Sequence, residues 1–464
     1  MYDYIIVGGG PSGLTLAYCL GQQNKILLID NNKTLGGCHR VVRTKDKLFT
    51  EHGPRVYASS YVNTKEFLRI MGLSFNDYFS KYNFGFSSIS TNIFKSLSFN
   101  EIKSLSLAFL FKSYNDMTMA EFMDKNNFSE SSRKLIDNLC RLTDGGDSTR
   151  YLLYEFLQLA NQNAFYSFYV NKIPNDDGLM KDWTLKLIET GNVDIMTNSQ
   201  VTEVLEHGVK INKKFIKGKN IILAIPPQHL VNLLEKSSPK IRNSFGDFNQ
   251  LKEWEIECRY ETYICGMLYW EDDIKTEKTY GGFTDTDWGI MFIELSDYMK
   301  FDNMKKAICV TISKPDAISQ FLGKTPHECT EKELLNEIVR QINLPEPSKK
   351  ILYPNIIKEN NRWVSKDTSF LLTKAGYGPC KSLLNNLFSV GVHNGRANFV
   401  PTTIEAAIEN AIHLVHDLNA ESKNKYKLKR VVSIFNVLNT IIVILILAIA
   451  IKCGSNILKD ILTN

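Results

Sequence analysis

Three glycines near the N-terminus have the spacing of a dinucleotide-binding turn. Gly8, Gly10 and Gly13 form the pattern G-x-G-x-x-G, and Asp30 follows at about the expected distance of ~20 residues. The first glycine permits a tight turn, the second lets the backbone approach a pyrophosphate, and the third lets a helix pack closely on a strand. The carboxylate of Asp30 can accept hydrogen bonds from a ribose. These residues predict that the chain binds a dinucleotide.

The elements needed to position these glycines occur around them in the correct order. Residues 3–7 predict a short buried strand, residues 14–20 a helix, and residues 25–29 a second strand that ends at the acid. Pro11 and Ser12 fall at the start of the helix, where free N–H groups and the positive end of the helix dipole suit a diphosphate. The segment therefore predicts a βαβ unit of the Rossmann type.

A second glycine pair, Gly36-Gly37, follows soon after the acid and precedes Arg40. With this stretch the sequence resembles the flavin-dependent amine oxidase superfamily, which includes protoporphyrinogen oxidase and phytoene desaturase-like enzymes. The resemblance implies that FAD is the cofactor and that Asp30, Asn31, the glycine pair and Arg40 help to hold it. The chain departs from the family by having Cys-His between the glycines and the arginine.

The segment around Gly53-Pro54 resembles the E-x-GP-R stretch that passes the flavin ring in protoporphyrinogen oxidases. A similar stretch occurs in UDP-galactopyranose mutase, a more distant flavoenzyme. The resemblance implies that Gly53 and Pro54 lie against the flavin and that Arg55 and Tyr57 face a substrate pocket. The alternative is a turn with a surface arginine.

Later motifs extend the resemblance along the chain. The strand beginning at Val201 resembles the one whose backbone binds adenine. A strand ending at Gly391 precedes a loop and a helix, and the resemblance implies that Thr403 and Ile404 offer N–H groups to the flavin. The Gly-Arg pair at residues 395–396 also occurs in the UDP-galactopyranose mutase branch and favours a function like that of the mutase.

One residue expected of an amine oxidase is missing. In that superfamily a lysine commonly lies near the flavin on a substrate-domain strand, which corresponds here to residues 260–270, and this segment has no lysine. Tyr263 or Cys265 occupies that region and is predicted to line the substrate pocket. No catalytic residue can be assigned, and ordinary amine oxidation is less favoured. The nine cysteines form no CxxC pair, so neither a metal site nor a disulfide framework is expected.

Charge and hydropathy exclude some partners and predict another. The net charge is +5, but the excess is concentrated in residues 423–430, so nucleic acid is not expected as a partner. Residues 431–451 contain no charged side chain and predict a single-pass C-terminal membrane anchor, with the enzyme-sized part on the cytoplasmic side. An amphipathic or buried terminal helix is the alternative. No leader precedes the first strand, which also predicts a cytoplasmic location for the folded part.

The predicted fold is α/β plus α+β: a discontinuous Rossmann-like FAD-binding domain with an inserted substrate domain and a C-terminal transmembrane helix. The boundaries predicted for the FAD-binding domain are 1–57, 190–228 and 350–418, and those for the substrate domain, mainly helical in its first part, are 58–189 and 229–349. Residues 419–430 are predicted to be a basic linker.

The predicted function is an FAD-dependent oxidoreductase of the amine oxidase/protoporphyrinogen oxidase type, which removes hydride from a lipophilic small molecule. One alternative is a redox-neutral flavoprotein resembling UDP-galactopyranose mutase. Another is a non-catalytic membrane protein that keeps the FAD-binding fold.

Overall fold

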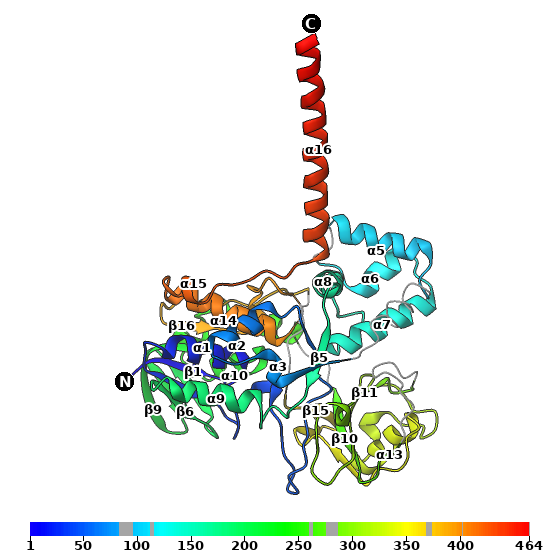
Figure 1. Ribbon diagram of the computed structural model, residues 1–464. Coiled ribbons are helices and arrows are strands. Elements are labelled where there is room, and N and C mark those ends of the chain that lie inside the picture. Colours follow the sequence, from blue (N-terminus) through cyan, green and yellow to red (C-terminus); the bar gives the residue numbers. More distant parts are fainter. Residues whose placement is uncertain are drawn as a thin grey trace.

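The computed structural model describes most of the chain (Figure 1). The described residues are 1–82, 96–111, 116–258, 263–274, 286–367, 374–400 and 402–463, without the side chains of residue 144 and residues 449–463. Residues 260–262 of the predicted lysine-free strand lie outside these ranges.

The largest sheet has seven strands in the order β6-β2-β1-β9-β8-β7, with β16 also paired to β9. Its strands are β1 (Tyr2–Val7), β2 (Ile26–Ile29), β6 (Val193–Met196), β7 (Val201–Leu205), β8 (Gly208–Ile211), β9 (Lys214–Leu223) and β16 (Leu387–Ser389). The central strand β1 runs parallel to both neighbours, with Ile5 paired to Leu27 and to Ile221. Three separate stretches of the chain therefore build one sheet.

The central strands are apolar throughout because both faces of the sheet are covered. On one face, Ile6 packs in a core with α1, α2, α9 and α14, and on the other Ile5 packs with α10, α12 and the β7–β8 hairpin. Figure 1 shows α1, α2, α9 and α14 grouped on this sheet. The helices are α1 (Pro11–Gly21), α2 (Val62–Ile70), α3 (Phe75–Tyr78), α9 (Leu179–Glu189), α10 (Pro227–Glu235), α11 (Pro239–Arg242), α12 (Phe248–Glu257), α14 (Ile404–Leu418) and α15 (Ser422–Lys425).

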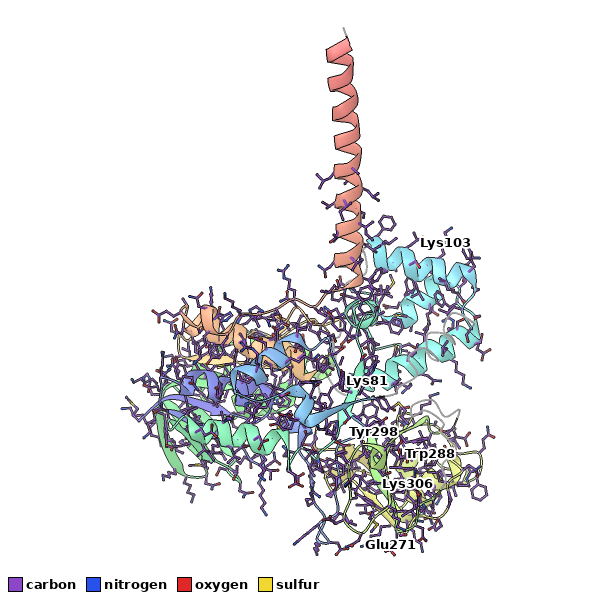
Figure 2. All side chains as sticks on the ribbon, in the orientation of Figure 1. Lys81, Lys103, Glu271, Trp288, Tyr298 and Lys306 are labelled. Carbon is purple, nitrogen blue, oxygen red and sulfur yellow. The ribbon has the colours of Figure 1, made fainter. Side chains whose placement is uncertain are left out.

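A second sheet is antiparallel, with the order β11-β12-β10-β13. Trp288 and Lys306 lie in this part of the molecule (Figure 2), and Trp288 is fully buried in its core with α13. Its elements are β10 (Ile264–Trp270), β11 (Ile290–Glu294), β12 (Lys306–Ile312), β13 (Lys349–Leu352) and α13 (Glu331–Gln341).

A group of helices lies beyond the two sheets and beside the base of the C-terminal helix (Figure 1). They share a separate apolar core that includes Phe122 and Tyr151. They are α5 (Phe99–Phe111), α6 (Met119–Lys125), α7 (Glu130–Asp144) and α8 (Leu153–Asn163). The remaining short elements are β3 (Tyr57–Ala58), β4 (Phe79–Lys81), β5 (Phe168–Asn171), β14 (Ile356–Glu359), β15 (Arg362–Ser365) and the 3₁₀ turns η1 (Gly37–His39), η2 (Leu295–Asp297), η3 (Pro326–Glu328) and η4 (Val392–Asn394). The division of the chain into domains at the predicted boundaries stays a prediction.

The C-terminal region corrects the predicted membrane anchor. The final helix α16 (Ile434–Thr463) begins after the start of the predicted span at residue 431. In the described part of the chain, no helix is long and apolar enough to cross a membrane. The side chains of α16 are described from Ile434 to Ala448, and this stretch includes the polar residues Asn436 and Asn439. A membrane crossing takes about 20 mainly apolar residues, which is longer than this stretch. The predicted transmembrane helix, and the anchored location derived from it, were wrong.

Candidate functional site

One large cavity joins the main sheet, the second sheet and the helical group. Its volume is about 1730 Å³, more than the ~300–1000 Å³ of most small-molecule sites. At one end it is lined by the glycine turn before α1, and at the other by apolar side chains of α5, α7 and α8. A cavity of this size can hold an extended cofactor together with a second molecule.

The glycines of the N-terminal turn serve different purposes. A Cβ on Gly8, whose φ is +107°, would lie 2.3 Å from the carbonyl oxygen of Ala224, and one on Gly13 would lie 1.9 Å from that of Gly8. These two glycines are therefore required by packing between β1, α1 and β9. A Cβ on Gly10 would meet only the Cα of Gly37, at an ordinary 3.7 Å. Since Gly10 lines the cavity, its missing side chain leaves room for a ligand.

The N-terminus of α1 opens onto the cavity as an anion-binding position. Gly10 is its N-cap, Pro11 occupies the first turn, no side chain caps the helix, and the first turn contains no acid. Ser12 lines the cavity too, and its hydroxyl donates to the carbonyl of Ala407 in α14 at 2.9 Å. The free N–H groups and the dipole of α1 therefore suit a phosphate.

Asp30, at the end of β2, is held in a fixed orientation beside this turn. One carboxylate oxygen accepts from the N–H of Gly9 at 2.7 Å, and the other accepts from the backbone N–H of Asn32 at 2.8 Å. Asp30 and Asn31 both line the cavity. Oδ1 also accepts from the side-chain amide of Asn32 at 3.0 Å, whereas Oδ2 has a second lone pair and can accept from a sugar hydroxyl.

The second glycine pair packs against the first turn. The N–H of Gly36 donates to the carbonyl of Gly9 at 2.7 Å. A Cβ on Gly37, whose φ is +57°, would lie 2.9 Å from the Cα of Gly10. Gly37 lines the cavity, whereas Gly36 and Gly13 lie behind its lining. The two glycine-rich segments thus approach one another backbone to backbone.

Arg40 follows this pair and forms a buried ion pair that the sequence did not reveal. Its Nη2 lies 2.5 Å from Oδ1 of Asp367, and both side chains are less than a tenth exposed. The other oxygen of Asp367 accepts from Tyr353 at 2.6 Å and from Asn355 at 2.8 Å. Burial by itself raises the pKa of Asp367, but Arg40 and these hydrogen bonds outweigh it and hold the pKa below its usual value. Arg40 and Asp367 line the cavity as a neutralised pair.

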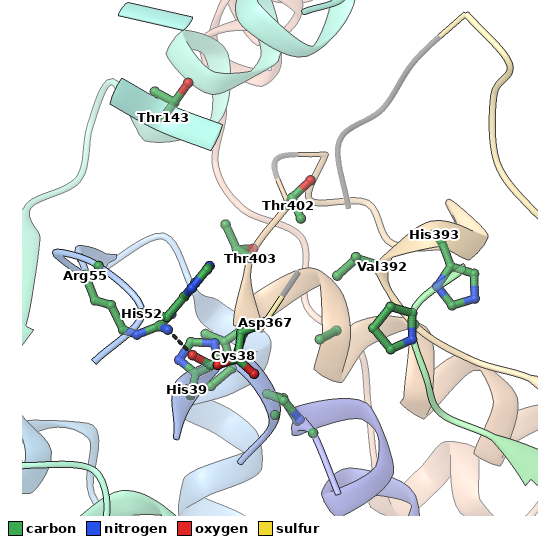
Figure 3. A pocket seen from close by; sticks show the side chains of 18 of the residues that line it. Cys38, His39, His52, Arg55, Thr143, Asp367, Val392, His393, Thr402 and Thr403 are labelled. Carbon is green, nitrogen blue, oxygen red and sulfur yellow. Dashed lines mark hydrogen bonds between the residues drawn. The ribbon is translucent and has the colours of Figure 1, made fainter. Parts of the chain in front are cut away.

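Gly53, Pro54 and Arg55 all line the middle of the cavity. Arg55 donates to the backbone carbonyl of Cys38, and its Nε lies 3.7 Å from a carboxylate oxygen of Glu51. Figure 3 shows Arg55, His52 and Asp367 close together, with Thr143 farther away across the same cavity. Arg55, whose side chain is 15% exposed, is therefore a largely buried cation of the cavity lining and not a surface residue.

Cys265 lies behind this segment and outside the cavity lining. Its Sγ donates to the carbonyl of His52 at 2.7 Å and lies 3.1 Å from the hydroxyl of Thr311. A Cβ on Gly53 would come within 3.3 Å of that sulfur. Burial raises the pKa of Cys265 to about 12, so the residue is a neutral thiol that supports the turn. The cavity is lined instead by Thr311.

The N-terminus of α14 is the second helix start at the cavity. Thr403 is its N-cap, and its hydroxyl accepts from the N–H of Ala406 at 3.3 Å. Thr403 and Ile404 line the cavity, as does Gly391, two residues after the end of β16. The loop before the helix is fixed by Glu409, which accepts from the N–H of Asn398 at 2.9 Å. The helices α1 and α14 pack together with both N-termini on the cavity.

The loop after Gly391 contains a buried histidine and a paired arginine. His393 is buried, and its Nε2 lies 3.0 Å from the hydroxyl of Ser389. Burial lowers the pKa of His393 to about 4, so this histidine is neutral. Arg396 pairs with Asp417 at 2.8 Å and is not among the described residues that line the cavity. The Gly-Arg pair therefore gives no support to the mutase alternative.

Tyr57 and Tyr263 both line the cavity. The hydroxyl of Tyr57 lies 3.2 Å from Nδ1 of His39, and that of Tyr263 donates to the carbonyl of Arg141. Strand β10 carries no lysine in the described residues. The lysines in the described lining are Lys236 and Lys366, which lie outside the strands of the second sheet.

The sequence did not identify the apolar part of the lining. These side chains come from α5, α7, α8 and the base of α16: Ile102, Leu105, Phe109, Leu110, Ile136, Leu139, Leu142, Phe156, Leu157, Leu159, Ala160, Ile434 and Leu438. Apolar residues at helical spacing indicate a buried face but do not show whether that face meets another element or a ligand. Val201, predicted to bind adenine, lines the opposite end of the cavity.

Comparisons with known proteins support the predicted fold. The family model of an NAD(P)-binding Rossmann-like domain matches residues 6–71. No curated protein matches the chain in sequence. The structure is similar to that of putrescine oxidase bound to putrescine, with a TM-score of 0.63 and 12% identity over 90% of this chain and 99% of the other.

Two further solved structures show the same likeness. Cyclohexylamine oxidase from Brevibacterium oxydans has a TM-score of 0.57 and 14% identity over 90% of this chain and 99% of its own. An oxidoreductase from Methanosarcina mazei has a TM-score of 0.61 and 12% identity over 89% and 99%. At these identities the likeness establishes the fold. The predicted resemblance to the flavin-dependent amine oxidase superfamily is confirmed at that level.

Proposed function

We propose that this protein is an FAD-dependent oxidoreductase of the amine oxidase/protoporphyrinogen oxidase type, acting on a lipophilic small molecule. The observation that carries the proposal is the continuous cavity, which has two helix N-termini at one part and an apolar chamber at another. The predicted fold resemblance and the structures of the two amine oxidases support the same class of chemistry.

The described residues fit FAD on chemical grounds. The uncapped N-terminus of α1 and the bare backbone at Gly10 provide a place for the diphosphate. Asp30 lies beside that place with acceptor capacity for a ribose. Of the predicted cofactor-binding residues, those in the cavity lining are Gly8, Gly10, Pro11, Ser12, Asp30, Asn31, Gly37, Arg40, Gly53, Pro54, Val201, Gly391, Thr403 and Ile404. Their roles toward FAD stay proposals.

When bound, FAD would supply the acceptor for a hydride. The residues of the chain would then contribute to the reaction in three ways. The first turn of α14 stabilises negative charge on the group that it faces. The apolar walls exclude water from the chamber. Arg55 supplies a permanent positive charge beside the paired Arg40 and Asp367. Its neighbour His52, whose pKa burial lowers to about 4, stays uncharged near neutral pH.

The charges of the cavity disfavour a cationic substrate. The acids in its described lining are Asp30 and Asp367, and both already accept hydrogen bonds from the protein. An ammonium group would therefore find Asp367 already paired with Arg40, and Asp30 lies beside the glycine turn at the proposed cofactor end. The large apolar surface of α5, α7 and α8 can bury the hydrocarbon part of a substrate, and each Å² of apolar surface removed from water stabilises binding by roughly 25 cal/mol. These features support a lipophilic substrate.

The decisive test is the visible absorption spectrum of the purified full-length chain. The proposal predicts a yellow protein with bound flavin, released on denaturation in a form that chromatography identifies as FAD. Peroxide release with porphyrinogens and with amines then compares the two substrate classes, and porphyrinogens are expected to give the higher kcat/KM. A colourless protein that takes up no flavin on reconstitution would overturn the proposal.

A further inference from the structure

The base of α16 forms one wall of the apolar chamber. Ile434 and Leu438 line the cavity, and they lie on one face of the helix because residues four apart are neighbours there. Phe435, on the adjoining side, stacks on Phe109 of α5 with ring centroids 4.3 Å apart and an interplanar angle of 16°. Figure 1 shows α16 rising from the body beside α5 and α8.

The segment before the helix is fastened to the body by several hydrogen bonds. The backbone of Lys429 donates to Asn63 at 2.7 Å and accepts from it at 3.0 Å. The N–H of Val432 donates to the hydroxyl of Tyr166 at 3.0 Å. These contacts place the start of α16 at a defined position above the chamber.

A further bond fixes the first turn of the helix itself. The N–H of Phe435 donates to the side-chain oxygen of Asn161 in α8 at 3.0 Å, and Ser433 bonds through its hydroxyl to Asn436 at 2.5 Å. Val437 on the outer side is 37% exposed. The inner face of this turn is therefore built into the cavity, and the outer face is not.

We propose that Ile434 and Leu438 determine substrate specificity, because they line the chamber that receives the apolar part of the substrate, and that Phe435 holds them in position through its stack on Phe109. The site residues predicted from the sequence line other parts of the cavity, so Ile434 and Leu438 add a wall that those residues do not provide. The inference rests on the proposed function for the identity of the chamber as a substrate site. Its chemical requirement is an uncharged ring or chain, since Leu438 and Phe109 offer only apolar contact.

The test compares two tryptophan substitutions on the same turn of the full-length protein. Leu438→Trp adds bulk on the chamber side, and Val437→Trp adds the same bulk on the exposed side. The probe is N-phenyl-1-naphthylamine, an apolar fluorophore whose emission rises on binding. We expect Leu438→Trp to weaken probe affinity about tenfold, which corresponds to about 1.4 kcal/mol, and Val437→Trp to change it less than about twofold.

Equal probe affinity in Leu438→Trp and wild type would overturn the inference, as would equal loss in both variants. Any binding of probe to the exposed residues farther along α16 is common to all three proteins and cancels in the comparison. If Leu438→Trp fails to fold, Ile434→Trp tests the same face one turn earlier, with the same expected loss and the same contradictory result. The visible spectrum is recorded in parallel, so that a missing flavin, which would count against the proposed function, is distinguished from an unchanged probe affinity.

Discussion

The two ends of the cavity are constructed on different principles. The proposed cofactor end is built mainly on backbone turns at Gly8–Gly13 and residues 36–37, together with Asp30, and these lie close together in the first part of the chain. The proposed substrate end consists of apolar side chains from helices and strands that are far apart in the sequence. A backbone turn leaves a recognisable glycine spacing, whereas a ligand-facing leucine resembles any core leucine.

The ends also differ in their electrostatics. The cofactor end and the middle contain helix dipoles, the buried Arg40–Asp367 pair and the Arg55 cation. The chamber between α5, α7 and α8 is lined mostly by hydrocarbon. A substitution at the first end is therefore expected to act on charge and backbone fit, and one at the second on shape and apolar area.

The largest expected effect is at Gly10. Gly10→Val should abolish flavin retention, because the branched side chain would occupy the space that the turn leaves for the diphosphate. The measurement is the ratio of flavin to protein absorbance after purification. Leu438→Ala, at the other end of the cavity, is the control and should retain flavin. Undiminished flavin in Gly10→Val would refute the placement of the diphosphate.

The next effect concerns the buried pair. Asp367→Asn should lower the free energy of unfolding by about 3–5 kcal/mol, because Arg40 would be left as an uncompensated buried charge. Thermal and urea unfolding measure this change. Asp316→Asn removes the partner of Arg362 in an exposed pair and should cost less than about 1 kcal/mol. Similar costs for the two variants would show that burial does not set the strength of the Arg40 pair.

Glu51 should give a pH-dependent effect of intermediate size. Burial raises the pKa of Glu51 from 4.5 to about 7, with Arg55 opposing the shift. The folded state therefore prefers the protonated carboxyl, and this contribution to stability is complete below pH 4.5 and is lost as the pH rises through 7. Glu51→Gln, which cannot ionise, should gain stability relative to wild type over that window, by up to about 3 kcal/mol. A constant difference in melting temperature between pH 4.5 and 8 would contradict this prediction.

The smallest expected effect is at the aromatic stack. Phe435→Leu should lower stability by only about 0.5–1.5 kcal/mol, since it removes the ring contact with Phe109 but retains apolar bulk. Its flavin content should equal that of wild type, because the stack lies at the chamber end. Differential scanning calorimetry and the visible spectrum measure both quantities. A loss of flavin in this variant would show that the two ends are coupled.

Part of this architecture followed from short motifs. The βαβ unit, the acid at position 30 and the second glycine pair were predicted because each depends on residues that are neighbours in the chain. The approach of α1 and α14 to one cavity was also anticipated through the family resemblance. The C-terminal helix shows the limit of such reasoning: an apolar run at 431–451 indicated a membrane span, yet its first residues precede the helix and Ile434 lines the cavity.

The sequence by itself determined where a dinucleotide turn would form, because glycine spacing acts through local backbone geometry. Only the tertiary structure decided that Asp367 neutralises Arg40, that Cys265 lies behind the Gly53 turn, and that the base of α16 completes the chamber. Those relations join residues separated by most of the chain. They depend on how helices and sheets pack, and neither residue type nor spacing records that packing.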